Sequence, residues 1–415
     1  MIFVDHYGGP PAAMMVTRGG EVTMRTEQRA GPILAIATAG YLLSAWAWAL
    51  LAPLAPLLRD TLGLTAIQQA AAVSIPVVVG SLGRVPVGAL TDRLGARTAF
   101  LLVAAATVAA LLVLTVVVEH SAAGLLIGAG LLGVAGTMFA VAVPVVSSRF
   151  AAPRRGLALG VLGTGLCGGA IGGLTTVRLV EQHGIGAPFL AAAAGVALFA
   201  VLVVMTVPDT PRRPSTGGRP GGALVAVLRL PITRRGALWN AVTSALFVTF
   251  SSYLPVYLTN AYGLPLDRTG YAMAGFIVLA VLMRPVGGWL ADRLAPRRPL
   301  TTALVVLAAA VTAQAFTPPL PLVVTLLLPV IAVALGIASG ALLAQVAAVA
   351  PPAMIGRVSG MVTGVAGLAG FASPLLMASS VNHTTGYGPA LGVLAAATAV
   401  AAISALTGSG HGSPR

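Results

Sequence analysis

The sequence predicts an all-α membrane protein with twelve transmembrane helices in two pseudo-symmetric six-helix bundles. Three observations lead to this fold class. Hydrophobic residues make up 57% of the chain and charged residues 8%, with a mean hydropathy of +0.96, outside the range of soluble globular domains. Apolar segments of transmembrane length recur, since a hydrocarbon core about 30 Å thick takes roughly 20 residues per helix. A motif of the first half returns 200 residues later.

Twelve apolar segments define the predicted helices in chain order. They run over 32–57, 67–91, 98–118, 122–148, 156–180 and 186–207, then 236–258, 269–291, 299–317, 320–350, 355–381 and 387–407. The segment between the sixth and seventh helices is rich in Pro, Gly and Arg, so we interpret it as a linker. The predicted domains are a tail at 1–31, a bundle at 32–207, the linker at 208–235, a second bundle at 236–407 and a tail at 408–415.

The placement of the arginines orients these helices. All 24 basic residues are arginines, against 10 acids. Nineteen of them fall on one side of the predicted membrane, in the tails, the linker and the loops of that side, and only Arg59, Arg178 and Arg268 fall on the other. This is the positive-inside pattern. We therefore expect a multi-pass protein of the cell (inner or plasma) membrane with both termini cytoplasmic, and no nucleic-acid partner despite the net charge of +14.

The internal repeat has a constant offset. RVPVGALTDRLGART at 84–98 resembles RPVGGWLADRLAPRR at 284–298, and GLALG at 156–160 lies over GRVSG at 356–360. Because each half has an even number of helices, both enter the membrane in the same orientation, as parallel repeats about an axis along the membrane normal.

Arg84 and Arg284 are the candidate binding residues. Each precedes a motif aspartate, Asp92 or Asp292, by eight residues, which at 1.5 Å per residue is about 12 Å and places the arginine near the membrane midplane. An arginine there costs about 2.5 to 3.5 kcal/mol, and the predicted helices hold no acid near the midplane to pair with it. Two interpretations remain: arginines bonded only to helix carbonyls, or arginines that bind an anion from outside the chain.

The anion interpretation favours a small, flat, monovalent oxyanion. A guanidinium is a planar fork that binds a planar oxyanion bidentately and stays charged at physiological pH. Two such forks suit nitrate or nitrite, although this geometry leaves other small anions open.

Two further sets of residues have conformational roles in this interpretation. Arg, Gly and Asp recur at i, i+4 and i+8 on one helix face, and we expect the motif residues to latch one state of the protein; they are Gly88, Asp92, Arg93, Arg97, Gly288, Asp292 and Arg293. Glycine-rich stretches permit close packing of helices that slide, and their glycines are Gly160, Gly163, Gly165, Gly168, Gly360, Gly364, Gly367 and Gly370.

The loop pattern G-x-x-x-D-R-x-G-x-R, present at 88–97 and less completely at 288–297, resembles the loop motif of the major facilitator superfamily. More specifically, GSLGRVPVGALTDRLGAR, GVAGTMFAVAVPVVSSRF, GLALGVLGTGLCGG and FIVLAVLMRPVGGWLADRL resemble the nitrate/nitrite porter family. This resemblance covers nearly the whole chain. It implies the major facilitator fold, binding of the substrate anion by Arg84 and Arg284, and an aromatic cavity wall at Phe139.

The sequence departs from the family's glycine signatures. The signature asparagine is replaced by Leu166, several glycines of the second signature are Thr363, Ala366 and Ala369, and Asn240 or a neighbour stands where some relatives have a substrate-facing tyrosine. These departures leave the identity of the anion open.

We therefore expect a secondary transporter of nitrate or nitrite that works by alternating access, through exchange or symport, as a monomer without cofactor or metal. The alternative is a proton-coupled exporter of drugs or metabolites, which would need a membrane-embedded carboxylate. A non-transporting nutrient sensor on the same fold is a further alternative. An enzyme is not expected, because the predicted helices hold no nucleophile, base and metal-ligand cluster; the single cysteine, Cys167, also excludes an intrachain disulfide.

Overall fold

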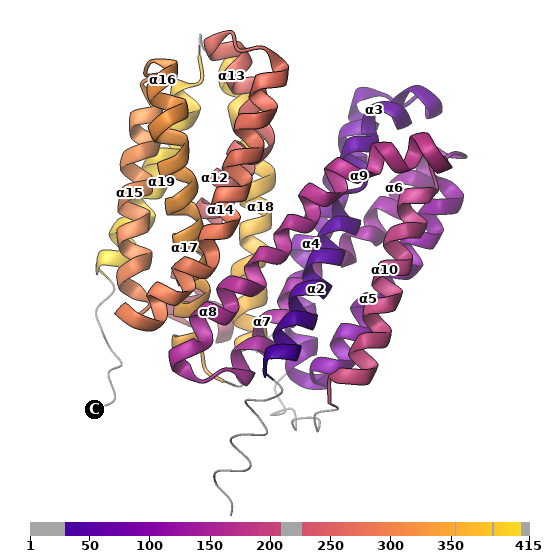
Figure 1. Cartoon of the computed structure of the whole chain (residues 1–415), viewed down its shortest axis with the longest axis horizontal. Coiled ribbons are helices and arrows are strands. Elements are labelled where there is room, and N and C mark those ends of the chain that lie inside the picture. The colour runs from indigo at the N-terminus through magenta and orange to yellow at the C-terminus, as the bar shows by residue number, and fades with distance from the viewer. Residues whose placement is uncertain (1–29, 209–225, 353, 384–385, 408–415) are drawn as a thin grey trace, which may run out of the picture.

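The computed structural model describes residues 30–208, 226–352, 354–383 and 386–407, and the regular secondary structure in these ranges is helical. Twelve helices in them are long and apolar enough to cross a membrane. Figure 1 shows two bundles standing side by side, one coloured indigo to magenta and the other salmon to yellow. The expected all-α fold with twelve spans is confirmed.

The first bundle contains spans 1 to 6. Spans 1, 4 and 5 are each divided into shorter segments, and spans 4 and 5 contain a short 3₁₀ turn, η1 or η2, at the division. The elements are α2 (Ala30–Ala49), α3 (Leu51–Leu62), α4 (Ala66–Leu94), α5 (Ala96–Val117), α6 (Ala122–Leu132), η1 (Gly133–Thr137), α7 (Met138–Arg149), α8 (Ala152–Gly163), η2 (Thr164–Leu166), α9 (Cys167–His183) and α10 (Ala187–Thr206).

The second bundle contains spans 7 to 12. Spans 7 and 10 each contain a π-helical segment, η3 or η4, in place of the 3₁₀ turns of the first bundle. The elements are α12 (Pro231–Val248), η3 (Thr249–Tyr253), α13 (Leu254–Tyr262), α14 (Leu266–Leu294), α15 (Arg297–Ala315), α16 (Leu320–Leu322), η4 (Val323–Leu327), α17 (Leu328–Val349), α18 (Ile355–His383) and α19 (Gly388–Thr407).

Span 7 begins earlier than the apolar pattern predicts. We placed its start at residue 236, after Arg234 and Arg235, but α12 starts at Pro231. Leu230 is extended and Pro231 occupies the first turn, where its missing N–H removes no helical hydrogen bond. Arg234 and Arg235 therefore lie inside the first turns of α12. Positive charge is tolerated at this end of the helix, because it lies near the membrane surface and not among lipid chains.

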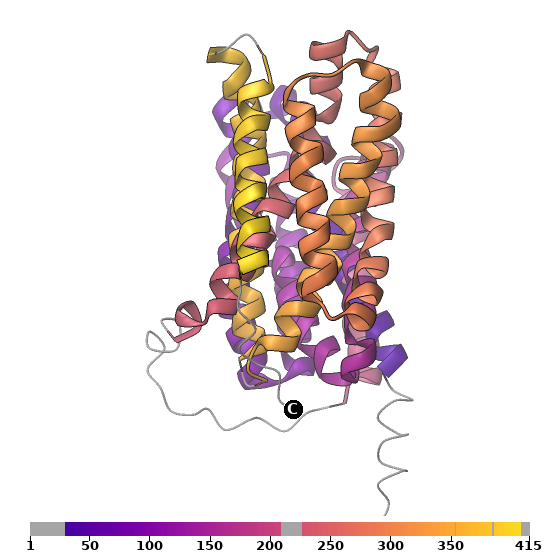
Figure 2. The same ribbon diagram turned by 90° about the vertical axis from the view of Figure 1, so that its left-hand side faces the viewer.

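Both bundles share one end, at the bottom of Figures 1 and 2, where α2 and α12 begin and α10 and α19 end. We call this end the linker side, because the segment that joins α10 to α12 leaves from it. The two helices that carry the repeated motif, α4 and α14, are each 29 residues long and keep the offset of 200 at both ends. Each packs against a helix of the opposite bundle, α4 against α18 and α14 against α8.

Candidate functional site

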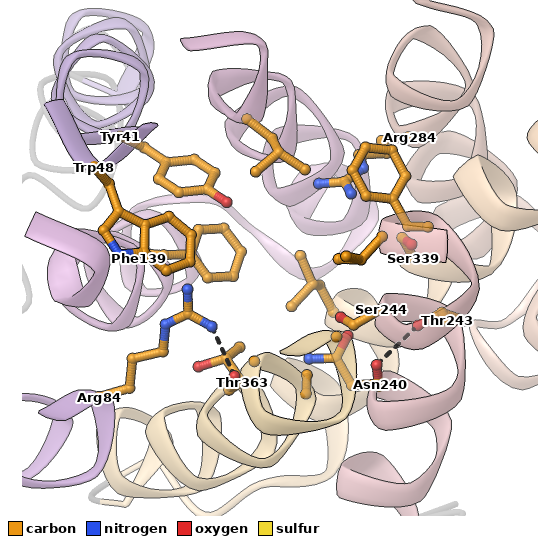
Figure 3. A pocket seen from close by; sticks show the side chains of 17 residues that line it. Tyr41, Trp48, Arg84, Phe139, Asn240, Thr243, Ser244, Arg284, Ser339 and Thr363 are labelled. Atoms are coloured by element: carbon orange, nitrogen blue, oxygen red, sulfur yellow. Dashed lines mark hydrogen bonds between the residues drawn. The ribbon is translucent and has the colours of Figure 1, made fainter. Parts of the chain in front are cut away.

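A cavity of about 150 Å³ lies between the two bundles (Figure 3). Both halves contribute to its wall, which contains two arginines, several aromatic rings and several hydroxyl groups. It is lined by Tyr41, Trp48, Arg84, Phe139, Leu166, Asn240, Thr243, Ser244, Phe247, Val248, Arg284, Ser339, Leu343, Thr363, Ala366, Gly367 and Gly370. None of these seventeen residues is an acid.

Arg84 is held rigidly in this wall. Its side chain is only 8% exposed, its Nε donates to the Gly136 carbonyl at 2.9 Å and its Nη1 to the Thr363 carbonyl at 2.7 Å. The guanidinium carbon also lies 5.9 Å from the centre of the Trp48 ring, within range of a cation–π interaction. Gly136 lies in the 3₁₀ turn η1 of the same bundle, whereas Thr363 lies in α18 of the opposite bundle. Arg84 therefore also joins the two halves.

Arg284 has fewer contacts. Its Nη1 donates to the Gly163 carbonyl at 3.0 Å, and its guanidinium carbon lies 5.4 Å from the centre of the Phe247 ring. Gly163 lies at the end of α8, next to η2 and in the opposite bundle. Each arginine thus donates to a carbonyl of the bundle opposite to its own, and these two acceptors, Thr363 for Arg84 and Gly163 for Arg284, are 200 residues apart. The repeat therefore includes the hydrogen-bond partner of each arginine as well as the arginine.

Helix carbonyls satisfy only part of each guanidinium. A guanidinium carries five N–H donors, of which Arg84 uses Nε and one N–H of Nη1, and Arg284 one N–H of Nη1. Figure 3 shows both guanidinium groups at the cavity, from opposite sides. Hydrogen bonds to helix carbonyls therefore use only some of the N–H donors of the two arginines, and the remaining donors are available to a ligand.

The aromatic wall includes residues that sequence reasoning missed. Phe139, the predicted one, lines the cavity and its ring lies 4.6 Å from that of Tyr41. Tyr41 and Trp48 come from the first span, and Phe247 comes from the seventh. Tyr41 and Trp48 are seven residues apart and so share a helix face, a spacing that could have indicated a common environment. No comparable signal singled out Phe247 from the other aromatic residues of its span.

The predicted glycines of spans 5 and 11 lie where two backbones come close. A Cβ on Gly160 or Gly360 would overlap the carbonyl oxygen of Arg284 or Arg84 respectively, and one on Gly163 would lie 3.2 Å from Arg284 Cδ. The other predicted positions also face neighbouring chain: Gly165 faces Tyr41, Gly168 faces the Leu42 carbonyl, Gly364 and Gly367 face Ser81, and Gly370 faces Val248. Gly160, Gly163, Gly360, Gly364 and Gly367 thus permit the packing of each arginine helix against the opposite half, whereas Gly165, Gly168 and Gly370 face helices of their own half.

The motif aspartates bond across the two bundles on the linker side. Asp92 accepts hydrogen bonds from the backbone N–H groups of Gly356 and Arg357, both at 3.1 Å, and its Oδ2 is 4.0 Å from Arg357 Nε. Asp292 accepts from the N–H groups of Gly156 and Leu157, at 2.7 and 2.8 Å. Each carboxylate thus caps the N-terminal turns of a helix in the opposite half, where the helix dipole favours negative charge.

The motif glycines make these contacts sterically possible. A Cβ on Gly88 would overlap the Gly356 carbonyl, and one on Gly288 would overlap the Gly156 carbonyl. Because the obstacle in each case is backbone, it could not move aside as a flexible side chain would.

The motif arginines are distributed differently. Arg293 stacks on Trp289, with its guanidinium carbon 4.6 Å from the ring centre. Arg297 donates to the carbonyls of Ala405 and Leu406 at the end of α19, as basic side chains commonly do at helix C-termini. Arg93 and Arg97 lie at the matching turn between α4 and α5, on the linker side.

The residues that depart from the family signatures meet at the cavity. Leu166, Asn240, Thr363 and Ala366 all line it, whereas Ala369 does not. The Asn240 side chain donates to the Val362 carbonyl at 3.3 Å. Four of the five positions at which the sequence departs from the family pattern therefore lie around the two arginines.

Comparisons with known proteins agree with this architecture. Residues 37–374 match the sequence profile of the Major Facilitator Superfamily. Among solved structures, the human organic anion transporter MFSD10 aligns with a TM-score of 0.75 at 19% identity over 91% of this chain and 99% of its own. The fucose:proton symporter FucP of E. coli aligns with the same TM-score at 17% identity over 90% and 97%. At these identities the likeness concerns the fold.

Sequence relatives are more specific. The protein named "Probable nitrate/nitrite transporter NarK2" of Mycobacterium tuberculosis is 36% identical over 350 residues, which cover 84% of this chain and 89% of the relative. The "Nitrite extrusion protein" of Bacillus subtilis is 30% identical over 78% of this chain and 80% of its own. The chain therefore belongs to the major facilitator superfamily of transporters and, within it, to the nitrate/nitrite porter family.

Proposed function

We propose that this protein is a secondary transporter that carries nitrate or nitrite across the cell membrane by alternating access. The observation that carries the proposal is the pair Arg84 and Arg284, which come from opposite bundles to one small cavity with no acid in its wall. An uncompensated positive charge at this depth requires an anion, and the planar guanidinium forks favour a planar oxyanion. The names of the relatives point to the same two anions.

The size of the cavity separates this function from its main alternative. Pockets for drug-sized ligands measure roughly 300 to 1,000 Å³, whereas this cavity measures about 150 Å³. A proton-coupled exporter of drugs would also need an embedded carboxylate, and the cavity wall contains none. The observations therefore favour a small anion over an organic or cationic substrate.

The cross-bundle contacts support alternating access. An anion between Arg84 and Arg284 is held by both halves, so it faces whichever side of the protein opens. On the linker side, Asp92 and Asp292 join the halves through helix N-termini. We propose that these contacts are the latch of a state closed on the linker side, and that they break when the anion leaves toward that side.

The charge of the empty site favours exchange over uniport. Two fixed positive charges strain the empty carrier, and a bound monovalent anion relieves about half of that charge. Rearrangement should then be easier when the carrier is loaded. Counterflow stimulated by internal anion in vesicles would support this; net uptake that is unaffected by internal anion, at fixed membrane potential, would contradict it.

We further propose that the linker side faces the cytoplasm of a monomeric protein in the inner or plasma membrane, with bundles at 32–207 and 236–407 and the linker at 208–235. The asymmetry of nineteen arginines against three supports this orientation. Tags at residue 215 and at both termini should report a cytoplasmic location, and residues near 120 and 183 an external one. An external residue 215 would contradict the proposal.

The decisive experiment is anion-specific uptake into proteoliposomes. Nitrate, nitrite, chloride and formate are offered separately, with empty liposomes as the control. We expect uptake of nitrate or nitrite well above that of chloride and formate. Binding without uptake would indicate a sensor instead, and neither binding nor uptake of nitrate and nitrite would overturn the proposal.

A further inference from the structure

Tyr41 occupies a position in the cavity that no sequence motif indicates. It comes from α2, and its ring is largely buried, with 9% of the residue exposed. Figure 3 shows its hydroxyl pointing into the space between Arg84 and Arg284. Within the described parts of the chain, this hydroxyl makes no hydrogen bond. The hydroxyl oxygen is not fully buried, so it is open to the cavity and can donate to a ligand there.

The Tyr41 ring is held in place by its neighbours. It packs against Phe139, with ring centres 4.6 Å apart at an interplanar angle of 40°. On its other side, a Cβ on Gly165 would lie 2.7 Å from Tyr41 Cδ1 and 3.0 Å from its Cβ. The glycine at 165 therefore makes room for this ring, and the hydroxyl is preorganised at the cavity rather than ordered by a ligand.

Other polar groups of the wall are placed differently. The hydroxyls of Thr243 and Thr363 donate to carbonyls of their own helices, Thr243 to Trp239 at 3.0 Å and Thr363 to Ser359 at 2.8 Å. Ser244 and Ser339 lie on the wall formed by the second bundle (Figure 3). In the first bundle, Leu166 offers no donor, and the indole N–H of Trp48 is buried without a partner. Tyr41 carries the one hydroxyl that the first bundle contributes to the residues lining the cavity.

We propose that Tyr41 is a specificity-determining residue, whose hydroxyl donates a hydrogen bond to an oxygen of the bound oxyanion beside the two guanidinium groups. This inference rests on the proposed function. A tyrosine hydroxyl can donate a hydrogen bond as well as accept one. Each oxygen of a planar oxyanion has two in-plane lone pairs. Two bidentate forks use four of the six lone pairs on the oxygens of nitrate and leave acceptors for the hydroxyl. The same two forks use all four lone pairs on the oxygens of nitrite. The Tyr41 hydroxyl therefore favours nitrate over nitrite.

The test compares Tyr41→Phe, which keeps the ring and removes the hydroxyl, with the parent protein. Nitrate and nitrite affinities are measured by titration calorimetry on full-length protein in detergent. Losing a hydrogen bond to a charged ligand should weaken nitrate binding roughly tenfold or more, and nitrite binding clearly less, so that the nitrate-to-nitrite preference falls.

Two matched variants separate the hydroxyl from general effects. Tyr253→Phe and Tyr271→Phe each remove a tyrosine hydroxyl from outside the cavity lining. We expect both to keep the parental nitrate-to-nitrite preference. Thermal unfolding of each variant checks that the fold is retained.

The possible outcomes are distinct. A fall in the nitrate preference confined to Tyr41→Phe supports the inference. An unchanged preference, or an equal loss of both anions as a packing defect would cause, overturns it while leaving the proposed function in place. If the parent protein binds neither anion, the proposed function fails and the inference fails with it.

Discussion

The two halves of this protein place an arginine at the same register and surround it differently. Arg84 is 8% exposed and donates to two carbonyls, one in each bundle. Arg284 is less buried and donates to one carbonyl, Gly163. Arg84 is thus the more constrained of the two, and Arg284 keeps more donors for a ligand. A repeated motif fixes where a side chain lies along its helix, but the opposite half decides how firmly it is held.

The helix irregularities also differ between the halves. Spans 4 and 5 of the first bundle contain 3₁₀ turns, and the acceptor carbonyls Gly136 and Gly163 lie in or beside them. Spans 7 and 10 of the second bundle contain π segments instead. Both kinds of irregularity often mark functional sites. Here the tighter turns of the first bundle accompany two of the three arginine–carbonyl bonds.

The largest expected effect comes from changing either arginine. Arg84→Lys and Arg284→Lys keep the charge but remove the planar fork. Each should lower anion affinity by tenfold to above a hundredfold, because a hydrogen bond to a charged group contributes about 1.5 to 3 kcal/mol. Arg84→Lys should also destabilise the protein more, since it loses two carbonyl bonds. Titration calorimetry and thermal unfolding measure the two effects.

Arg93→Lys is the control for the arginine variants, because Arg93 lies at the α4–α5 turn and not at the cavity. It should leave affinity unchanged. If both cavity lysine variants bound nitrate and nitrite as tightly as the parent, the arginine site would be wrong, and carbonyl-bonded structural arginines would take its place.

A second comparison concerns the glycine contacts of α4 and α14. Gly88→Ala and Gly288→Ala place a Cβ against backbone of the opposite half, and overpacking of this kind costs about 1 to 3 kcal/mol. We expect the state closed on the linker side to be disfavoured and exchange in proteoliposomes to slow by roughly tenfold. Gly275→Ala is the control on α14, because its Cβ would have no atom within 4 Å. Equal exchange rates in all three variants would contradict close packing at these positions.

The aspartate latches offer a third comparison. Asp292 makes shorter bonds to its helix N-terminus, 2.7 and 2.8 Å, than Asp92 does, 3.1 Å for both. A negative charge at a helix N-terminus contributes about 0.3 to 1 kcal/mol. Asp92 also pairs with Arg357, so Asp292→Asn and Asp92→Asn should each shift the population toward a linker-side opening a few-fold. Distances between spin labels on the linker-side ends of α14 and α8, and of α4 and α18, would report this; unchanged distances in both variants would contradict the latch.

The smallest expected effect on transport concerns the turn after each motif, where we expect a change in stability alone. Gly95 has φ of 84° and ψ of 168°, and the matching Ala295 has φ of 65° and ψ of 134°. A positive φ combined with such a ψ costs a residue with a Cβ roughly 1 to 3 kcal/mol, so Ala295→Gly should raise the thermal midpoint and Gly95→Ala should lower it. Both variants should keep the parental anion affinity. A destabilised Ala295→Gly variant would show that the gain in unfolded-state entropy outweighs the relief of strain.

The sequence by itself determined the parts of this protein that depend on hydrophobicity and periodicity. Long apolar segments have few alternatives to helices in a bilayer, because their backbone groups must be bonded internally, so twelve spans followed from composition and length. The repeat placed Arg84 and Arg284 at one register, and the scarcity of acids indicated an anion. The sequence did not predict the start of α12 at Pro231, because a hydropathy pattern does not extend across charged residues at the end of a helix.

Only the tertiary structure decided what surrounds the arginines. Arg84 donates to the backbone carbonyls of Gly136 and Thr363 and not to their side chains. Every residue has a backbone carbonyl, so the residue type at these positions gives no sign of the contact. The helices that carry Tyr41 and Phe247 also carry aromatic residues that do not line the cavity, Trp46 and Trp239. Helix rotation and contact with the opposite bundle decide which of them reach the cavity. Such positions depend on packing between segments far apart in the chain, for which a local sequence pattern has no signal.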